Sequence, residues 1–319
     1  MNSLSNSLPT PALVTPSTIS PSASFSNTLQ SGGFATIRAS GDFTRAAGDG
    51  TSKAKAVISP NDMTNFISYD AATNTYALNF TNSSGQASQQ LFDPQPADRQ
   101  VTVFADGNPD PTEVRYQRQD CYFSGCFSED YLITHAGSGS FAYTYTAVAM
   151  VQDRRDPAIG LATVRNDLAV FGMPTPTSAV PRTGSATYAL DLLSSSYTGS
   201  GSGSVNFGAG TYDFSGTINQ VIGASTNTGT FQSSGKLASG SSGFSGTVDL
   251  SVARSYASGI PGVTTTENYA YRGRIGGSFF GPAAQELGGA FVAPATSFTS
   301  TAGSISEPPP VYGAILGHR

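Results

Sequence analysis

The sequence contains no tryptophan, only two cysteines and two histidines, and few charged side chains. Aspartate, glutamate, lysine and arginine make up 12% of its 319 residues, against about 25% in an average soluble domain. A helical protein of this size would need long runs of alanine, leucine, glutamate and lysine, and the sequence has none. Low charge together with 36 glycines instead predicts many short strands joined by polar turns.

Positive charge is especially scarce. The net charge is −5, from 16 basic and 21 acidic residues, and lysine occurs only at Lys53, Lys55 and Lys236. A nucleic-acid-binding domain normally presents a basic face, so we expect no nucleic-acid partner. The sequence also lacks any apolar run of about 18 residues, which excludes a membrane-spanning helix.

The amino-terminal segment, residues 1–24, is rich in serine, threonine and proline and has no hydrophobic periodicity. This composition predicts a flexible tether. The segment contains neither the basic start and apolar region of a signal peptide nor an early cysteine for lipidation. Two interpretations stay open: the chain begins after a removed signal, or the protein is exported by another route.

The cysteines, Cys121 and Cys126, lie in the sequence CYFSGC. A turn at Ser124 and Gly125 would bring them within disulfide reach, and a disulfide fits an exported protein. A zinc site would add His135 as a third ligand but would lack a fourth, so we expect no metal and no cofactor.

A first structured region is expected over residues 25–170, a strand-rich subdomain that we call the handle. Its predicted strands are Thr75–Phe80, Gln100–Ala105, Asp130–His135 and Ser140–Val151. In the last of these, alternation places Phe141, Tyr143, Tyr145, Ala147 and Ala149 on one face. Residues 171–184 contain three prolines and predict a stiff connection to the next subdomain.

Residues 185–319 contain eight further strand candidates. They are Ala186–Leu193, Gly201–Phe207, Thr211–Asn219, Gly229–Ala238, Phe244–Ala253, Tyr269–Phe280, Leu287–Pro294 and Val311–Leu316. Eight antiparallel strands suffice to close a barrel filled by side chains, and closure removes the exposed sheet edges. We therefore predict an all-β chain with a handle and an eight-stranded antiparallel β-barrel; a two-sheet sandwich is the alternative.

The segment GRIGGSFFGPAAQELGGAF, residues 273–291, is the most distinctive stretch. We interpret it as structural, with glycines at close backbone approaches and a turn at Gly281 and Pro282. Strand structure resumes at Gly288 and Gly289, and Glu286 is expected to accept hydrogen bonds from the turn.

This segment, together with PRTGSATY (residues 181–188), SVNFGAGTYDFSGTI (204–218), FSGTV (244–248) and GAILGHR (313–319), resembles the barrel of transferrin-binding protein B-like surface proteins of Gram-negative bacteria. The order and spacing are similar to the single-lobe relatives, described as transferrin-binding-like solute-binding proteins. The resemblance covers roughly residues 160–319, and the first half matches only loosely.

The resemblance implies a non-catalytic binding protein on the outer-membrane surface or outside the cell. Its partner would be an unknown protein or small solute, such as an iron or haem source, taken up with a TonB-dependent outer-membrane receptor. With one lobe and no lipidation cysteine, the chain departs from true transferrin receptors, so transferrin is not the expected ligand. The alternative is a structural or adhesive surface protein without a small ligand.

The candidate binding residues surround the cysteines. They are Tyr116, Tyr122, Phe123, Phe127 and Tyr131. Rigid aromatic side chains bind partners at low entropic cost. The alternative is that these rings simply pack beneath the loop.

Three other sets of residues have candidate roles. Arg115, Arg118, Arg154 and Arg155 could bind an anion, but neighbouring aspartates favour a self-neutralised surface. Haem ligation by His135, His318 or a tyrosine stays open, although no spacing selects it. Neither histidine lies near a G-x-S-x-G pattern, so we expect no enzyme activity.

Overall fold

The protein is described from a computed structural model. The structure describes residues 32–33, 36–46, 52–62, 66–70, 72, 75–81, 87–92, 113–122, 125–134, 143–157, 161–194, 197–222, 225–257, 264–301 and 308–319. The predicted tether at 1–24, the strand predicted at Gln100–Ala105, and the candidates Phe123 and His135 lie outside these residues. No helix in the described ranges is long and apolar enough to cross a membrane.

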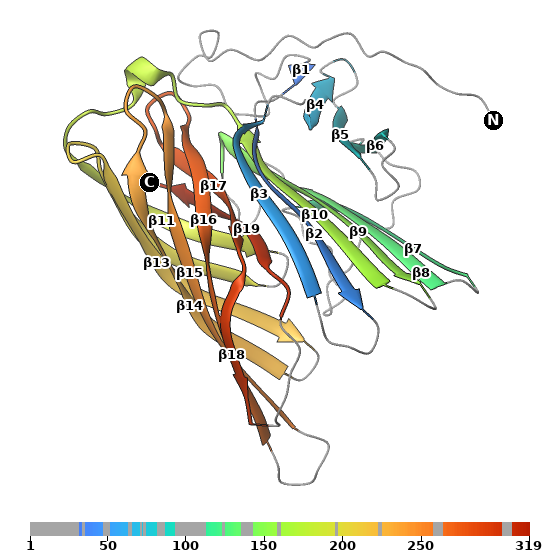
Figure 1. The fold of residues 1–319 in the computed structure, drawn as a ribbon. Helices are drawn as coiled ribbons and strands as arrows, with labels where there is room; N and C mark the ends of the chain where they lie inside the picture. The colour runs from blue at the N-terminus through green and yellow to red at the C-terminus, as the bar shows by residue number, and fades with distance from the viewer. Residues whose placement is uncertain are drawn as a thin grey trace.

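The handle consists of two antiparallel sheets (Figure 1). The smaller has the order β1-β4-β5-β6, with β1 at Gly32–Gly33, β4 at Ile67–Asp70, β5 at Thr75–Thr81 and β6 at Ala87–Phe92. The larger has the order β3-β2-β10-β9-β8-β7. Its strands are β2 (Thr36–Ala46), β3 (Ser52–Asp62), β7 (Glu113–Tyr122), β8 (Gly125–Thr134), β9 (Thr146–Pro157) and β10 (Leu161–Gly172).

The barrel follows a short connection that contains the 3-10 turn η2 (Thr177–Ala179). Its strands are β11 (Ser185–Ser194), β12 (Thr198–Asn206), β13 (Thr211–Ile222), β14 (Ser225–Leu237), β15 (Gly243–Ala257), β16 (Thr264–Phe280), β17 (Glu286–Ala293) and β19 (Val311–His318). Pairing of β11 with β19 and of β15 with β16 closes these eight strands into an antiparallel ring. The predicted all-β handle and barrel are confirmed, and the sandwich alternative is wrong.

The six-stranded sheet is the middle layer of the molecule. On one face, Ala147, Ala149 and Val151 join a core with Phe66 and Leu78 of the small-sheet region. The other face packs on the barrel in a second core, which includes the side chains Ile37, Val148, Leu168, Val170, Ala290, Val292 and Leu316. A third core fills the barrel itself. Handle and barrel therefore share buried apolar surface and form one packed structure.

All eight barrel strands predicted from the sequence are present, with ends displaced by a few residues. The strands named from the sequence did not include β2, β3, β4, β6, β7 and β10 of the handle, nor the short strand β18 (Ala295–Ser300), which pairs with β16. The strand predicted at Ser140–Val151 begins only at Thr146. The prediction that Tyr143 shares a face with Ala147 is wrong, because Tyr143 precedes the strand and packs against the barrel.

The barrel interior explains why its strands are rich in glycine. Large aromatic rings lie directly across from glycines on the neighbouring strand, where the absent side chain leaves room for the ring. The cross-strand pairs are Phe214 with Gly203, Phe231 with Gly216, Phe244 with Gly277 and Phe291 with Gly313. Each of these four rings is at most 3% exposed, so the lumen is a packed core at these positions.

Gly277→Ala is expected to lower the free energy of unfolding by about 1–3 kcal/mol, the usual cost of overpacking. A methyl group at Gly277 would lie 2.0 Å from Cζ of Phe244, which is closer than any real contact. The control is Gly243→Ala, whose added methyl would lie no closer than 3.4 Å to any neighbour. Denaturant unfolding followed by circular dichroism compares the two variants, and equal losses would contradict the packing argument.

Candidate functional site

The predicted aromatic residues lie on a β-hairpin formed by β7 and β8. Tyr116 is paired with Tyr131, Asp120 with Phe127, and Tyr122 with Gly125. Paired residues of an antiparallel sheet point to the same face, and so do residues two apart along a strand. The register therefore brings positions 116, 122, 127 and 131 to one face of the sheet.

That face is the one turned away from the barrel. Tyr131 is paired with Val151 of β9, and Val151 is a buried member of the core beneath the small sheet. Val151 is paired in turn with Asp167 of β10. One row of positions thus runs across the sheet from the aromatic pair to a buried carboxylate.

The neighbouring row on the same face is charged along its whole length. Across the strands from β3 to β7 its positions are Lys55, Asp42, Arg165, Asp153, Glu129 and Arg118. Opposite charges placed directly across a sheet stabilise each other, whereas the directly paired positions Asp153 and Glu129 carry like charges. The expectation of a self-neutralised surface agrees with this register for Arg118, which is paired with Glu129.

The four arginines considered for an anion-binding patch do not share a face. Arg155 is paired with Phe127 and so lies on the aromatic face with Arg118. Arg115 and Arg154 are paired with Leu132 and Ser128, which belong to the opposite face. The sheet therefore divides the predicted cluster into two pairs.

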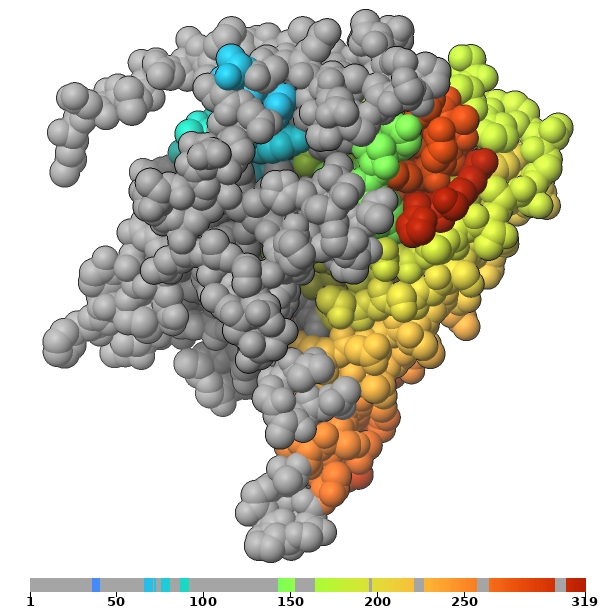
Figure 2. All heavy atoms as spheres, turned by 180° about the vertical axis from the view of Figure 1, so that it is seen from behind, coloured from blue at the N-terminus to red at the C-terminus, as the bar shows by residue number. Residues whose placement is uncertain are grey.

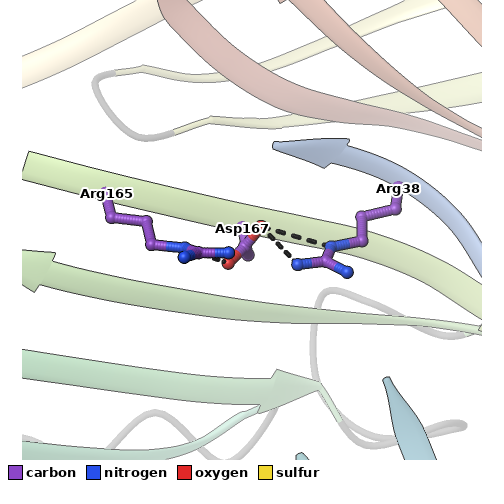
Figure 3. A network of polar contacts seen from close by, with 3 residues as sticks. All are labelled: Arg38, Arg165 and Asp167. Atoms are coloured by element: carbon purple, nitrogen blue, oxygen red, sulfur yellow. Dashed lines mark hydrogen bonds and ion pairs between the residues drawn. The ribbon is translucent and has the colours of Figure 1, made fainter. Parts of the chain in front are cut away.

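A buried ion-pair network anchors the middle of this face (Figure 3). The Asp167 side chain is fully buried. Its Oδ1 accepts hydrogen bonds from Nε and Nη2 of Arg38 at 3.2 and 2.7 Å, and its Oδ2 accepts from Nε of Arg165 at 3.0 Å. The Arg38 guanidinium also lies 4.5 Å from the ring centre of Phe66. The hydrogen bonds join β2 to β10, and the contact with Phe66 joins this pair of strands to the small-sheet region.

The cysteines occupy the other face of the hairpin. Cys121 and Cys126 are directly paired across β7 and β8, one step from the tip. Directly opposed residues have Cα atoms about 4.5–5.5 Å apart, which is within the range that a disulfide bridges.

We therefore expect an oxidised Cys121–Cys126 bond in protein prepared without reductant. Alkylation with iodoacetamide before proteolysis should leave the peptide that carries both cysteines unmodified and about 2 Da lighter than its reduced form. Recovery of two alkylated cysteines from protein isolated under oxidising conditions would contradict this prediction.

The distinctive turn between β16 and β17 joins the barrel to the handle. Gly281 has φ +80°, a conformation that glycine adopts without strain, and Gln285 Oε1 accepts the Ala283 amide at 2.8 Å. The prediction that Glu286 bonds to its own turn is wrong. Its two oxygens accept the backbone N–H groups of Thr144 and Tyr145 at 2.6 and 2.9 Å.

Gly288 and Gly289 lie inside β17. A methyl group at Gly288 would meet Val170 of the handle sheet at 2.6 Å, so this glycine permits the close approach of barrel and handle. Pro282 is part of the turn itself. These residues serve packing and connection, as the structural interpretation of the segment proposes.

His318 is near the same junction. Its ring lies 5.4 Å from the Tyr143 ring in an edge-on arrangement, and Tyr143 donates a hydrogen bond to Asp191 Oδ2 at 3.0 Å. Figure 2 shows the C-terminal segment beside the segment that leads into β9. In the described part of the chain, no three His, Cys, Asp or Glu side chains are placed to hold a metal ion. His318 is thus used in packing handle against barrel.

These features define an all-β protein in which a two-sheet handle packs against a closed eight-stranded barrel. No family model matches the chain, and no curated protein matches it. Among solved structures, it is similar to intact Ap-TbpB with N and C lobes, at 14% identity and a TM-score of 0.33, covering 79% of this chain and 53% of that one. The chain thus spans about half the length of that protein.

A second similar structure is a mutant of the vaccine antigen Transferrin Binding Protein B from Haemophilus parasuis Hp5. Identity is 12%, the TM-score is 0.36, and the match covers 90% of this chain and 76% of that one. A double mutant of the same antigen matches with a TM-score of 0.32. Similarity at this level assigns neither a family nor a ligand to the chain.

Proposed function

We propose that this protein is a non-catalytic binding protein that captures a protein partner or solute at the bacterial outer surface or outside the cell. The contact surface is the face of the six-stranded sheet that carries positions 116, 122, 127 and 131. The observation that carries the proposal is the register of β7, β8 and β9, which gathers these aromatic positions beside a charged row.

Two physical properties favour recognition at this face. An aromatic side chain has only two rotatable bonds, so little conformational entropy is lost when a partner covers it. The adjacent row alternates in sign over much of its length, and such a pattern orients a complementary partner. Neither property requires a catalytic group or cofactor.

The proposed classes of partner are those implied by the sequence resemblance to transferrin-binding protein B-like surface proteins. We propose nutrient capture, with iron or haem sources and other solutes as the classes of cargo, and delivery to a TonB-dependent outer-membrane receptor. Transferrin itself is not proposed as the ligand.

The proposal is tested by affinity capture with immobilised protein, exposed to cell-envelope extract and to culture or host fluid. The binding variant is Tyr116→Ser with Tyr131→Ser. The matched control is Gln117→Ser with Asp130→Ser, the adjacent cross-strand pair on the opposite face. A retained species that the binding variant loses and the control keeps supports the proposal. Retention of nothing, or equal loss from both variants, overturns it.

A structural or adhesive role is the second candidate, because β7 forms an edge of the six-stranded sheet among the described strands. An edge strand can pair with a strand of another molecule. Sedimentation at increasing concentration distinguishes the two roles. A mass that rises with concentration favours assembly, whereas a monomer at every concentration opposes it.

A further inference from the structure

The outer wall of the barrel carries three titratable side chains where the handle covers it. Glu286 of β17 is directly paired with His318 of β19. On the other side of β19, His318 is paired with Ala189 of β11, and Asp191 is paired with Leu316, which belongs to the core between handle and barrel. His318 therefore lies between two carboxyl groups, one directly across and one on the diagonal, at cross-strand separations of about 4.5–5.5 and 7–8 Å.

Residues 143–145, which precede β9, lie across this group, and we call them the strap. At one end, the Tyr143 hydroxyl donates a hydrogen bond to Oδ2 of Asp191 at 3.0 Å. At the other end, the backbone N–H groups of the next two residues donate to the two carboxyl oxygens of Glu286 at 2.6 and 2.9 Å. Between these ends, the Tyr143 ring lies edge-on to the His318 ring, with centres 5.4 Å apart. The strap thus joins β11 to β17 over the end of β19, and Figure 2 shows this segment in green beside the red C-terminal residues.

The two carboxyl groups are in surroundings that oppose their negative charge. Burial is the largest influence on both and raises the pKa of Glu286 and of Asp191, whereas the charge of His318 acts in the opposite direction on each. Burying a carboxylate costs free energy unless a positive charge or hydrogen-bond donors compensate it. The imidazole between them is therefore placed to supply that compensation.

The other charged groups near the junction point elsewhere. Arg319 follows His318, but its Nε donates to the hydroxyl of Tyr188 at 3.1 Å, and Tyr188 belongs to the core inside the barrel. The Asp167 network of the handle lies on the opposite face of the six-stranded sheet, beside Val151. Because histidine is the side chain that gains or loses its charge between pH 5 and 8, the compensation beneath the strap depends on pH.

We propose that the strap is a pH-dependent contact between handle and barrel, held closed when His318 is protonated and opened more often when His318 is neutral. The raised pKa values of Glu286 and Asp191 act in the same direction. A closed strap holds protons more tightly than an open one, so its closure is favoured in acid and weakens as the pH rises. The opening is local, because handle and barrel also share an apolar core that does not titrate. The inference does not rest on the contact surface proposed on the opposite face of the sheet.

Hydrogen exchange of the Thr144 and Tyr145 amides measures the opening, because both amides are bonded to Glu286 in the closed strap. Protection factors, corrected for the direct effect of pH on exchange, are compared at pH 5.5 and pH 8. We expect a fall of about tenfold, since one pKa unit of differential proton binding corresponds to a tenfold change in an equilibrium. The Leu237 amide, which donates to the Gly210 carbonyl of the barrel at 2.9 Å, should keep constant protection. Constant protection of the strap amides, or a rise with pH, overturns the proposal.

His318→Phe separates the charge of residue 318 from its packing, since phenylalanine keeps a ring beside Tyr143 and cannot be protonated. At pH 5.5 the strap amides of this variant should be about three- to tenfold less protected than in the native protein. At pH 8 the two proteins should be equally protected, because His318 is then neutral. An equal deficit at both pH values would mean that His318 acts through packing alone, which overturns the proposal.

Asp191→Asn tests the carboxyl side of the same contact. Asparagine keeps an acceptor for the Tyr143 hydroxyl but removes one of the two negative charges, so the loss of protection between pH 5.5 and pH 8 should be smaller than in the native protein. Asp249→Asn, which changes an exposed aspartate of the barrel wall, is the control and should keep the native loss. A native loss in Asp191→Asn, with circular dichroism confirming the fold, also overturns the proposal.

Discussion

Replacing Asp167 by alanine is expected to lower the free energy of unfolding by about 3–5 kcal/mol, because it removes the buried carboxylate that accepts three hydrogen bonds from Arg38 and Arg165. The Asp167 carboxylate is fully buried, and both Arg38 and Arg165 contact it while being mostly buried themselves. The alanine variant would leave two guanidinium groups side by side without the carboxylate that separates them. Denaturant unfolding monitored by circular dichroism measures the loss.

The matched control removes an aspartate from an exposed ion pair. Asp249 lies 3.6 Å from Arg272 on the barrel, with the two side chains 45% and 65% exposed. Exposed pairs contribute about 0–1 kcal/mol, so Asp249→Ala should scarcely change stability. If the free energy of unfolding falls equally in both alanine variants, burial is not the reason that the Asp167 network stabilises the protein.

Strands β15 and β10 show which strands the sequence could predict and which it could not. The strand predicted at Phe244–Ala253 is present as β15, where Phe244, Val248, Leu250 and Val252 alternate with polar residues and are all buried. This works because barrel strands have one face in the core and one in solvent. Strand β10 has buried residues on both faces, since it lies in the middle layer, so Asn166 and Asp167 are as buried as Leu168. Its sequence therefore lacks the alternation that reveals a strand.

Contacts between residues far apart in the chain could not be predicted from the sequence either. Arg38 and Asp167 are 129 positions apart in the chain, and no local pattern connects them. For the candidate binding face, the sequence predicted a turn between the two cysteines but not the hairpin register that pairs Tyr116 with Tyr131. The pairing of Glu286 with His318 depends on the register of β17 and β19, which composition does not determine.

Glu286→Ala is expected to destabilise the junction between handle and barrel by about 2–4 kcal/mol, because two partly buried backbone N–H groups lose a charged acceptor. Hydrogen exchange should show faster exchange at the Thr144 and Tyr145 amides than in the native protein. Gln285→Ala is the control, because the Gln285 side chain accepts the exposed Ala283 amide of its own turn, and its backbone carbonyl, which accepts the Arg319 N–H, is retained. Unchanged protection at both amides would contradict the assigned role of Glu286.

The pH dependence of Glu286→Gln gives a second test of this contact. Burial is the largest influence on the Glu286 carboxyl and raises its pKa above the ordinary value of 4.5, against the lowering effect of the two N–H donors. The folded state therefore holds the proton more tightly than the unfolded chain. The stability contributed by this proton is fully present below about pH 4.5 and decreases as the pH rises through the folded-state pKa.

Glutamine does not titrate, and it presents one acceptor and one amide donor to the two N–H groups. The native protein should consequently be more stable than Glu286→Gln at pH 4, and its advantage should shrink as the pH approaches 7. Asp191 and His318 are the same in both proteins, so position 286 is the only titratable group that differs between them. A difference that grows with pH would mean that the Thr144 and Tyr145 donors outweigh burial, and that the ionised carboxylate is the form that fastens the handle to the barrel.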